Sequence, residues 1–177
     1  MNQALVNFYC KNGTDAAGRT FNDIINFSDK ELEQVHDYVQ WLFPTLSVSS
    51  CNPDAPILDA ATINYLKKSP QFNLRFHAAL RKMFRFWGFV NTTSFGMDGI
   101  EIHTQTSFQP WMTTGNHNFL RFSRLLESSR LLGWPNTSKS FFESLIQLAS
   151  RMDQKIVNSK NVFFWYIAAH DTQLNKS

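Results

Sequence analysis

Hydrophobic residues recur at three- and four-residue steps along much of this chain, which is the spacing of a helix that buries one face. The clearest case lies between Pro70, which suits a first helical turn, and Gly88, which can end a helix. The spacing predicts one long amphipathic helix over this segment. Its apolar positions are Phe72, Phe76, Ala79, Leu80, Met83 and Trp87.

A second helix is predicted from its capping residues. Ser28 and Glu31 are three residues apart, as in a capping box, where each side chain satisfies the other residue's free backbone N–H. The apolar pattern continues as far as Phe43. Because Pro44 disfavours helical geometry at the residue before it, we predict that this helix ends there.

The rest of the chain is also mostly helical in pattern. Residues 161–171 are apolar on nearly every side, which is typical of a helix packed at the centre of a domain, with a buried strand as the alternative. The pattern of residues 91–115 predicts one irregular loop or short hairpin. Together these elements predict an all-α, compact bundle of six to eight helices. Its further helices are expected over residues 20–27, 60–68, 117–132 and 138–152.

Composition limits the class of protein. The chain has 177 residues, of which 43% are hydrophobic, and it includes 17 Phe, 5 Trp and 4 Tyr. This is enough apolar material for a packed core, so disorder is excluded and residues 1–177 are expected to form a single domain. The net charge of +3 is too small to indicate a concentrated basic surface, so nucleic acid is not expected as a partner.

The sequence favours a soluble, intracellular protein. Cys10 and Cys51 allow at most one disulfide, which is too few for a secreted disulfide scaffold. The N-terminus has no signal-peptide pattern. The longest apolar run, Val162–Ala169, is far shorter than the roughly 18–20 residues that a membrane span needs, so no transmembrane segment is expected.

The segment from His36 to Pro44 is the first candidate binding element. On a helix, His36 and Gln40 lie one turn apart and present two adjustable hydrogen-bonding groups. Alternatively, both are polar anchors buried at helix crossings and bonded to loop carbonyls. Trp41 follows in the most hydrophobic turn of this segment and is predicted to be mostly buried.

A second candidate element lies on the helix predicted over residues 117–132. His117, Arg121 and Arg124 fall on one face of it, and two guanidinium groups in such a row suit a carboxylate or phosphate. Alternatively, the arginines pair with internal carboxylates such as Glu33 and Asp37. Both interpretations are open at this point.

No catalytic pattern accompanies these elements. The chain has no HExxH, CxxC, GxSxG or glycine-rich phosphate loop, so we expect a protein that is not an enzyme and that needs no cofactor. A metal site built from His36, Asp37 and His117 is not demanded by their spacing, and no metal is expected.

These motifs resemble the conserved domain of the opioid growth factor receptor family. The segment from His36 to Pro44 matches the family element H-x-Y-I-Q-W-L-F-P, with Val39 in place of isoleucine. The resemblance covers about residues 7–170. Other matching positions are Phe8, Tyr9, Asp15, Gly18, Leu32, Glu33, Asn52, Ala55, Pro56, Leu58, Phe108, Gln109, Pro110, His117, Asn118, Leu120, Arg121, Arg124 and Leu126.

The resemblance implies an α-helical, receptor-like domain whose ligand is an enkephalin-type opioid peptide or another small peptide or anionic ligand. It also implies association with the nucleus or its envelope. The Asn- and Phe-rich chain is compatible with a microbial relative, for which opioid peptide would not be the natural ligand. From chemistry and motif position, the expected ligand-binding residues are His36, Gln40, Trp41, His117, Arg121 and Arg124.

Two other functions remain as alternatives to a receptor-like domain. One is a small-molecule or phosphate-processing enzyme that uses His36 and His117 as acid and base. The other is a helical module for protein interaction.

Overall fold

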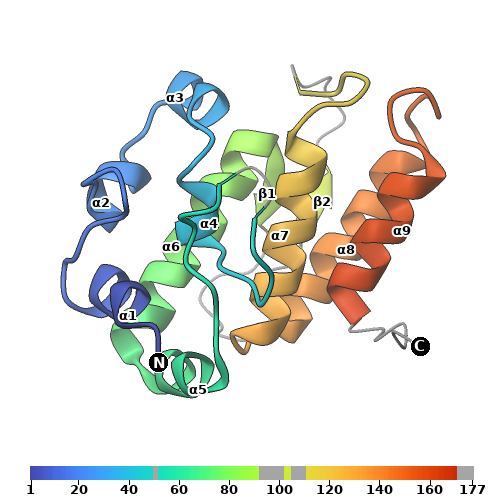
Figure 1. The fold of residues 1–177 in the computed structure, drawn as a ribbon. Helices are drawn as coiled ribbons and strands as arrows, with labels where there is room; N and C mark the ends of the chain where they lie inside the picture. The colour runs from blue at the N-terminus through green and yellow to red at the C-terminus, as the bar shows by residue number, and fades with distance from the viewer. Residues whose placement is uncertain (50–51, 92–101, 105–110, 171–177) are drawn as a thin grey trace. The chain divides into compact units, whose positions relative to one another are not determined.

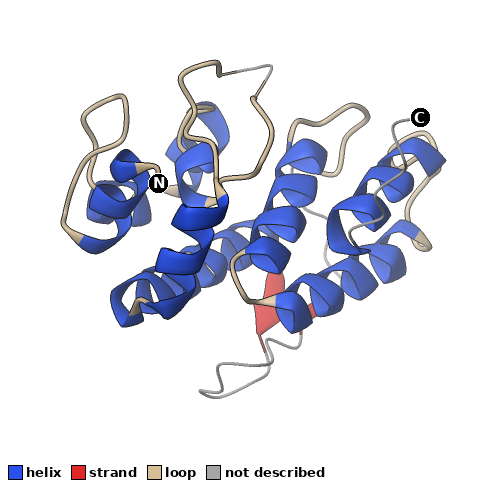
Figure 2. Ribbon diagram, turned by 60° about the horizontal axis from the view of Figure 1, so that its bottom comes forward, coloured by secondary structure: helices blue, strands red, loops and turns tan. Residues whose placement is uncertain are grey.

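The computed structural model describes most of the chain (Figure 1). Its residues form two compact units, Met1–Phe86 and Trp87–Ser177, and each is described by itself. The described residues are 1–49, 52–91, 102–104 and 111–170. They contain nine helices and two short strands, so the predicted all-α class is confirmed (Figure 2).

The first unit contains helices α1 to α6, the last of which runs one residue past its boundary. The long amphipathic helix predicted from Pro70 is α6, and all six of its predicted apolar positions are buried. Gly88 follows it with a φ of +80°, the left-handed geometry that a glycine adopts without strain. The bounds are α1 Gln3–Cys10, α2 Phe21–Ile25, α3 Asp29–Gln34, α4 Val39–Leu42, α5 Ala60–Lys68 and α6 Pro70–Trp87.

Aromatic rings join the helices of this first unit. The Tyr9 ring of α1 meets the Phe72 ring of α6 with centroids 4.8 Å apart, and Phe43 meets Phe76 of α6 at 5.7 Å. Arg75 of α6 donates to the carbonyls of Phe8 and Tyr9 at 2.9 and 3.0 Å. Those carbonyls lie in the last turn of α1, where helical partners are missing, so Arg75 satisfies the end of that helix.

The predicted single helix from Ser28 to Phe43 is wrong, because the chain leaves helical geometry between α3 and α4. The capping box of Ser28 and Glu31 does open α3, but Val35 ends it in an extended conformation with φ −87° and ψ 130°. The hydroxyl of Tyr38 donates to the Leu32 carbonyl at 2.9 Å. Side-chain bonds of this kind replace backbone bonds that a continuous helix would make.

The second unit packs three helices, α7, α8 and α9, against one another (Figures 1 and 2). Two strands, β1 and β2, pair antiparallel with Phe89 opposite Thr104, which fits the short hairpin predicted in this region. Trp87, Phe122 and Phe141 form its aromatic core, with Trp87 and Phe122 centroids 4.7 Å apart. The bounds are β1 Phe89–Asn91, β2 Ile102–Thr104, α7 Asn118–Leu131, α8 Pro135–Ala149 and α9 Ser159–His170.

The prediction that residues 161–171 form a centrally packed helix is wrong in its burial. The segment is helical as α9, and Trp165 is buried, with its indole N–H bonded to the Phe119 carbonyl at 3.0 Å. However, Phe163, Phe164 and Tyr166 are 45–51% exposed. A helix at the edge of a three-helix group has one outer side, and here that side carries aromatic rings.

Some sequence predictions fall outside the described residues, namely those on Cys51 and on Phe108, Gln109 and Pro110. Within the described residues, none of the helices is both long enough and apolar enough to cross a bilayer.

Candidate functional site

A tight turn in the first unit begins the site. Its backbone doubles back between Thr14 and Thr20, which form an antiparallel bridge. Inside the turn, Asp15 Oδ1 accepts hydrogen bonds from the backbone N–H groups of Ala17 at 3.0 Å and Arg19 at 2.8 Å. An aspartate that bonds its own downstream backbone is a common way to hold a turn, so this carboxylate fixes the loop that precedes α2.

The Arg19 guanidinium then joins this turn to the segment between α3 and α4. Its Nε and Nη2 lie 2.7 and 2.6 Å from Asp15 Oδ2, and Nη2 also lies 2.7 Å from Asp37 Oδ1. Burial opposes the charged form of Arg19, but the hydrogen bonds and charges of the two carboxylates outweigh it and raise the pKa of Arg19. The arginine is therefore permanently charged and shared by two acids.

The segment between α3 and α4 is also held by amide side chains. Asn52 Nδ2 lies 3.5 Å from the Asp37 carbonyl. In its hydrogen-bonded orientation, the Gln40 amide nitrogen lies 3.3 Å from the His36 carbonyl and 3.2 Å from the Asp37 carbonyl. These carbonyls lie in the break between the helices, where helical backbone hydrogen bonds are interrupted. The amide side chains supply donors there and so stabilise the turn.

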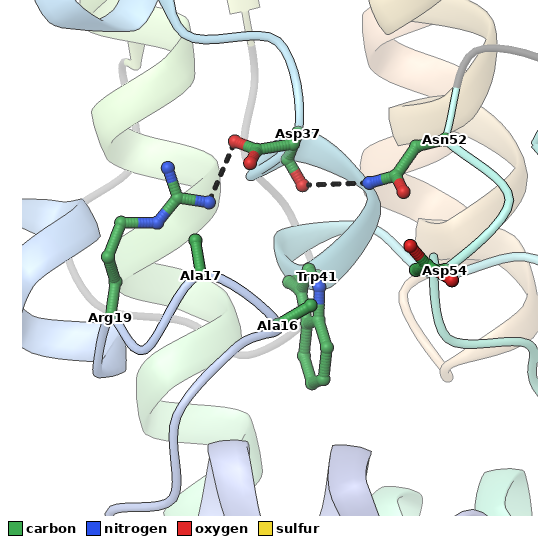
Figure 3. Close-up of a pocket in the computed structure, with 7 residues that line it drawn as sticks. All are labelled: Ala16, Ala17, Arg19, Asp37, Trp41, Asn52 and Asp54. Carbon is green, nitrogen blue, oxygen red and sulfur yellow. Dashed lines mark hydrogen bonds and ion pairs between the residues drawn. The ribbon is translucent and has the colours of Figure 1, made fainter.

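These residues surround a cavity of about 200 Å³ (Figure 3). Trp41 of α4 is one of the residues that line it, and only 5% of this residue is exposed. The indole ring packs against Phe8 with centroids 5.4 Å apart. Its nitrogen lies on the side of the ring toward Asp54 (Figure 3). The cavity is lined by Ala16, Ala17, Arg19, Asp37, Trp41, Asn52 and Asp54.

The cavity combines an aromatic ring with charged and polar groups. Asp37 and Asp54 contribute carboxylates, Arg19 a guanidinium and Asn52 an amide, and they converge from three separate segments of the first unit. This arrangement suits noncovalent recognition of a small polar group. Among the described residues, no three His, Cys, Asp or Glu side chains gather in the way that a metal ion requires.

Of the predicted binding residues in the first unit, Trp41 lines the cavity and its predicted burial is confirmed. Gln40 is buried beside it and bonds loop carbonyls, as the structural alternative predicts. His36 is exposed in the break between α3 and α4, so the prediction that it lies one helical turn before Gln40 is wrong. The cause is the extended backbone at Val35, which ends α3 early.

The other three predicted residues lie in the second unit. His117 precedes α7, and Arg121 and Arg124 lie within that helix, as predicted. Arg121 is only 6% exposed, and its Nη1 donates to Asn118 Oδ1 at 3.1 Å. Because these residues and Trp41 belong to different units, their sharing of one binding site stays a prediction.

Comparison with known proteins decides the family. The family model described as "Opioid growth factor receptor (OGFr) conserved region" matches residues 3–174 of the chain. The chain belongs to the opioid growth factor receptor family. No solved structure matches it.

Two vertebrate relatives within this family are similar to the chain. Opioid growth factor receptor-like protein 1 of Xenopus tropicalis is 31% identical over 118 residues, which are 67% of this chain and 23% of that protein. The Rattus norvegicus protein of the same name is 33% identical over 105 residues, or 59% of this chain and 22% of that protein. The chain therefore matches less than a quarter of the length of these relatives.

The opioid growth factor receptor pattern did contain a clue to the cavity that reasoning from residue chemistry missed. Asp15, Gly18 and Asn52 are all positions at which the sequence resembles the family. Gly18 has a φ of +80°, a left-handed geometry that favours glycine in the turn of Asp15. Arg19 follows Gly18 directly and Asp54 is two residues after Asn52, but nothing in this spacing predicted that they would line one cavity with Trp41.

Proposed function

We propose that this chain is a receptor-type domain that binds a short peptide, of enkephalin type or another sequence, at the cavity around Trp41. The observation that carries the proposal is the Trp41 side chain itself. It is almost completely buried, it lines the cavity, and its indole N–H makes no hydrogen bond with the described residues. A donor that borders a cavity and has no acceptor among the described residues favours a ligand that supplies one.

Two further observations support a peptide ligand. Membership of the opioid growth factor receptor family favours a receptor role. The cavity has charged carboxylates, an amide and an aromatic surface, which match the groups that a peptide presents: an amine, carbonyls, N–H groups and side-chain rings. We propose that the domain binds its ligand without catalysing a reaction and that it does so inside the cell. Association with the nucleus or its envelope is proposed from the family resemblance alone.

The experiment is a two-dimensional ¹H–¹⁵N NMR titration of the full chain that follows the tryptophan indole groups. The chain has 5 Trp, and the Trp41 resonance is assigned from its loss in Trp41→Phe. The indole N–H groups of Trp87, Trp111 and Trp165 are already bonded to protein acceptors at 2.9–3.2 Å and serve as internal controls.

The probes are an enkephalin-type pentapeptide and a mixture of unrelated pentapeptides. We expect a saturable shift of the Trp41 resonance with at least one of them, and little change at the three control resonances. Absence of any Trp41 shift up to millimolar peptide, or equal movement of all indole resonances, would overturn the proposed function.

A further inference from the structure

We infer that the cavity around Trp41 takes the N-terminal residue of its peptide, with the protonated α-amine beside Asp37 and Asp54 and the adjoining carbonyl at the Trp41 indole N–H. This inference rests on the proposed function and names the part of the peptide that is recognised.

The charges of the lining indicate a cation. Of the described residues that line the cavity, Arg19 alone is basic, against the two carboxylates of Asp37 and Asp54. The same guanidinium is also bonded to Asp15, whose side chain is fully buried. The one guanidinium is therefore bonded to both Asp15 and Asp37, and Asp54 adds a further carboxylate, which leaves the cavity with an excess of negative charge.

Asp54 is the carboxylate best placed to receive a ligand. It is exposed, it lines the cavity, and it makes no hydrogen bond or ion pair with any residue that the structure describes. Asp37, by contrast, already shares Arg19 with Asp15. An ammonium group placed beside the two carboxylates would reduce the excess negative charge of the site.

Trp41 adds a surface that can attract a cation and a donor that needs an acceptor. The ring lines a cavity with excess negative charge, where its face can attract a cation electrostatically. Its indole N–H can only donate a hydrogen bond. An ammonium group cannot accept that bond, so the ligand must carry an acceptor close to its cation.

A peptide N-terminus has this combination, since its α-ammonium group and its first carbonyl are separated by one carbon atom. The size of the site agrees with a single terminal residue: about 200 Å³ is less than the roughly 300–1,000 Å³ of pockets that enclose a drug-sized ligand. An anionic group, expected from the sequence at the arginines of the second unit, would meet repulsion from Asp37 and Asp54 here.

The test compares three probes that share one aromatic ring: tyrosyl-glycinamide, its N-acetylated form, and tyramine, which has the amine without the carbonyl. Dissociation constants come from the Trp41 indole resonance of the full chain. We expect the free dipeptide to bind at least about tenfold more tightly than the acetylated form, because acetylation removes the cation. Tyramine should bind more weakly than the free dipeptide and should not give its hydrogen-bond shift at Trp41.

Asp54→Asn provides the matching change in the protein. It should weaken binding of the free dipeptide about tenfold and leave binding of the acetylated form unchanged. Asp29→Asn is the control, since Asp29 is an exposed carboxylate of the same unit that does not line the cavity.

The outcomes separate the two proposals. Equal binding of the free and acetylated dipeptides, or no effect of Asp54→Asn on the free form, overturns the N-terminal inference and leaves the proposed peptide receptor in place. If neither these dipeptides nor the pentapeptides move the Trp41 resonance, both proposals are overturned.

Discussion

Arg19 Nη2 lies 2.7 Å from Asp37 Oδ1 and so connects two segments that are 18 residues apart in the sequence. The same nitrogen reaches the fully buried carboxylate of Asp15 at 2.6 Å. The Asp15 turn and the break between α3 and α4 are therefore held by one guanidinium. Both segments contribute residues to the cavity around Trp41, so the shape of that cavity depends on this connection.

The first prediction is that Arg19→Gln strongly destabilises the protein. The substitution leaves the buried Asp15 carboxylate without its ion-pair partner, and breaking a buried pair typically costs about 3–5 kcal/mol. Asp37→Asn is the control, because the Asp37 side chain is 49% exposed and pairs of that kind contribute about 0–1 kcal/mol. Urea unfolding measures both, and equal losses of stability would contradict the assigned roles.

The second prediction concerns Tyr9, whose hydroxyl donates to the Leu42 carbonyl at 2.5 Å inside the first unit. Burial raises the pKa of Tyr9 well above its usual value, so the hydroxyl remains a neutral donor. Tyr9→Phe keeps the ring but removes the donor at the end of α4. We expect a loss of about 1–3 kcal/mol in the free energy of unfolding. Unfolding at wild-type stability would show that the Leu42 carbonyl has another partner.

Local features of the fold were predictable from neighbouring residues. The Ser28–Glu31 capping box, the Asp59 N-cap and the buried face of α6 are all present in the structure. Each depends on residues within a few positions, where propensity and spacing decide the geometry. The start and type of these helices therefore followed from the sequence.

The break between α3 and α4 was not predictable in this way, because distant residues stabilise it. Arg19 bonds the Asp37 carboxylate, and Asn52 lies at hydrogen-bond distance from the Asp37 carbonyl. The apolar spacing through this segment fits a continuous helix, whereas the bonds from Arg19 and Asn52 favour the turn. Trp41 was predicted as a binding residue because it lies within the segment from His36 to Pro44. Arg19, Asn52 and Asp54 complete the cavity from other segments of the chain, so they were not predicted.

The third prediction is a pH dependence at the start of α2. The hydroxyl and then the backbone N–H of Thr20 donate to Asp23 at 2.6 and 2.8 Å, and they hold the pKa of Asp23 below its usual value. Because the pKa of Asp23 is lower in the folded state than in the unfolded state, its ionised carboxylate stabilises the protein fully at pH values above the unfolded-state pKa. This contribution is lost as the pH falls through the folded-state pKa.

Asp23→Asn tests this dependence, since asparagine keeps an acceptor oxygen but cannot carry the charge. We expect the variant to melt below the wild type at about pH 7 and the difference to shrink at about pH 3. Circular dichroism melts at both pH values measure it. A difference that is constant with pH would mean that the charge of Asp23 does not contribute.

The fourth prediction is that Arg121→Gln lowers stability by more than about 1 kcal/mol. Arg121 is buried in the second unit, and its partner Asn118 Oδ1 also accepts from the Trp87 indole N–H at 2.9 Å. Removal of the guanidinium therefore disturbs a buried polar group of three residues. Leu120→Ala is the control on the same helix, because Leu120 is exposed. Wild-type stability combined with lost anion binding would instead support Arg121 as a binding residue.

The last prediction separates the two roles of Trp41, as a core residue and as a cavity residue. Trp41→Ala removes a buried ring that packs against Phe8, and such changes cost about 3–5 kcal/mol, a large share of a total stability of about 5–15 kcal/mol. Trp41→Phe retains an aromatic ring beside Phe8 and should cost less than half as much, while it removes the indole donor that Trp41 gives to the cavity. We therefore expect the alanine variant to be insoluble or largely unfolded and the phenylalanine variant to fold but to bind peptide more weakly.

Urea unfolding measures the loss of stability of the two Trp41 variants, and peptide titration measures the loss of binding. Tyr65→Ala is the control for loss of a surface ring, because Tyr65 is exposed. An alanine variant that melts within about two degrees of wild type would show that Trp41 contributes to the cavity without supporting the core.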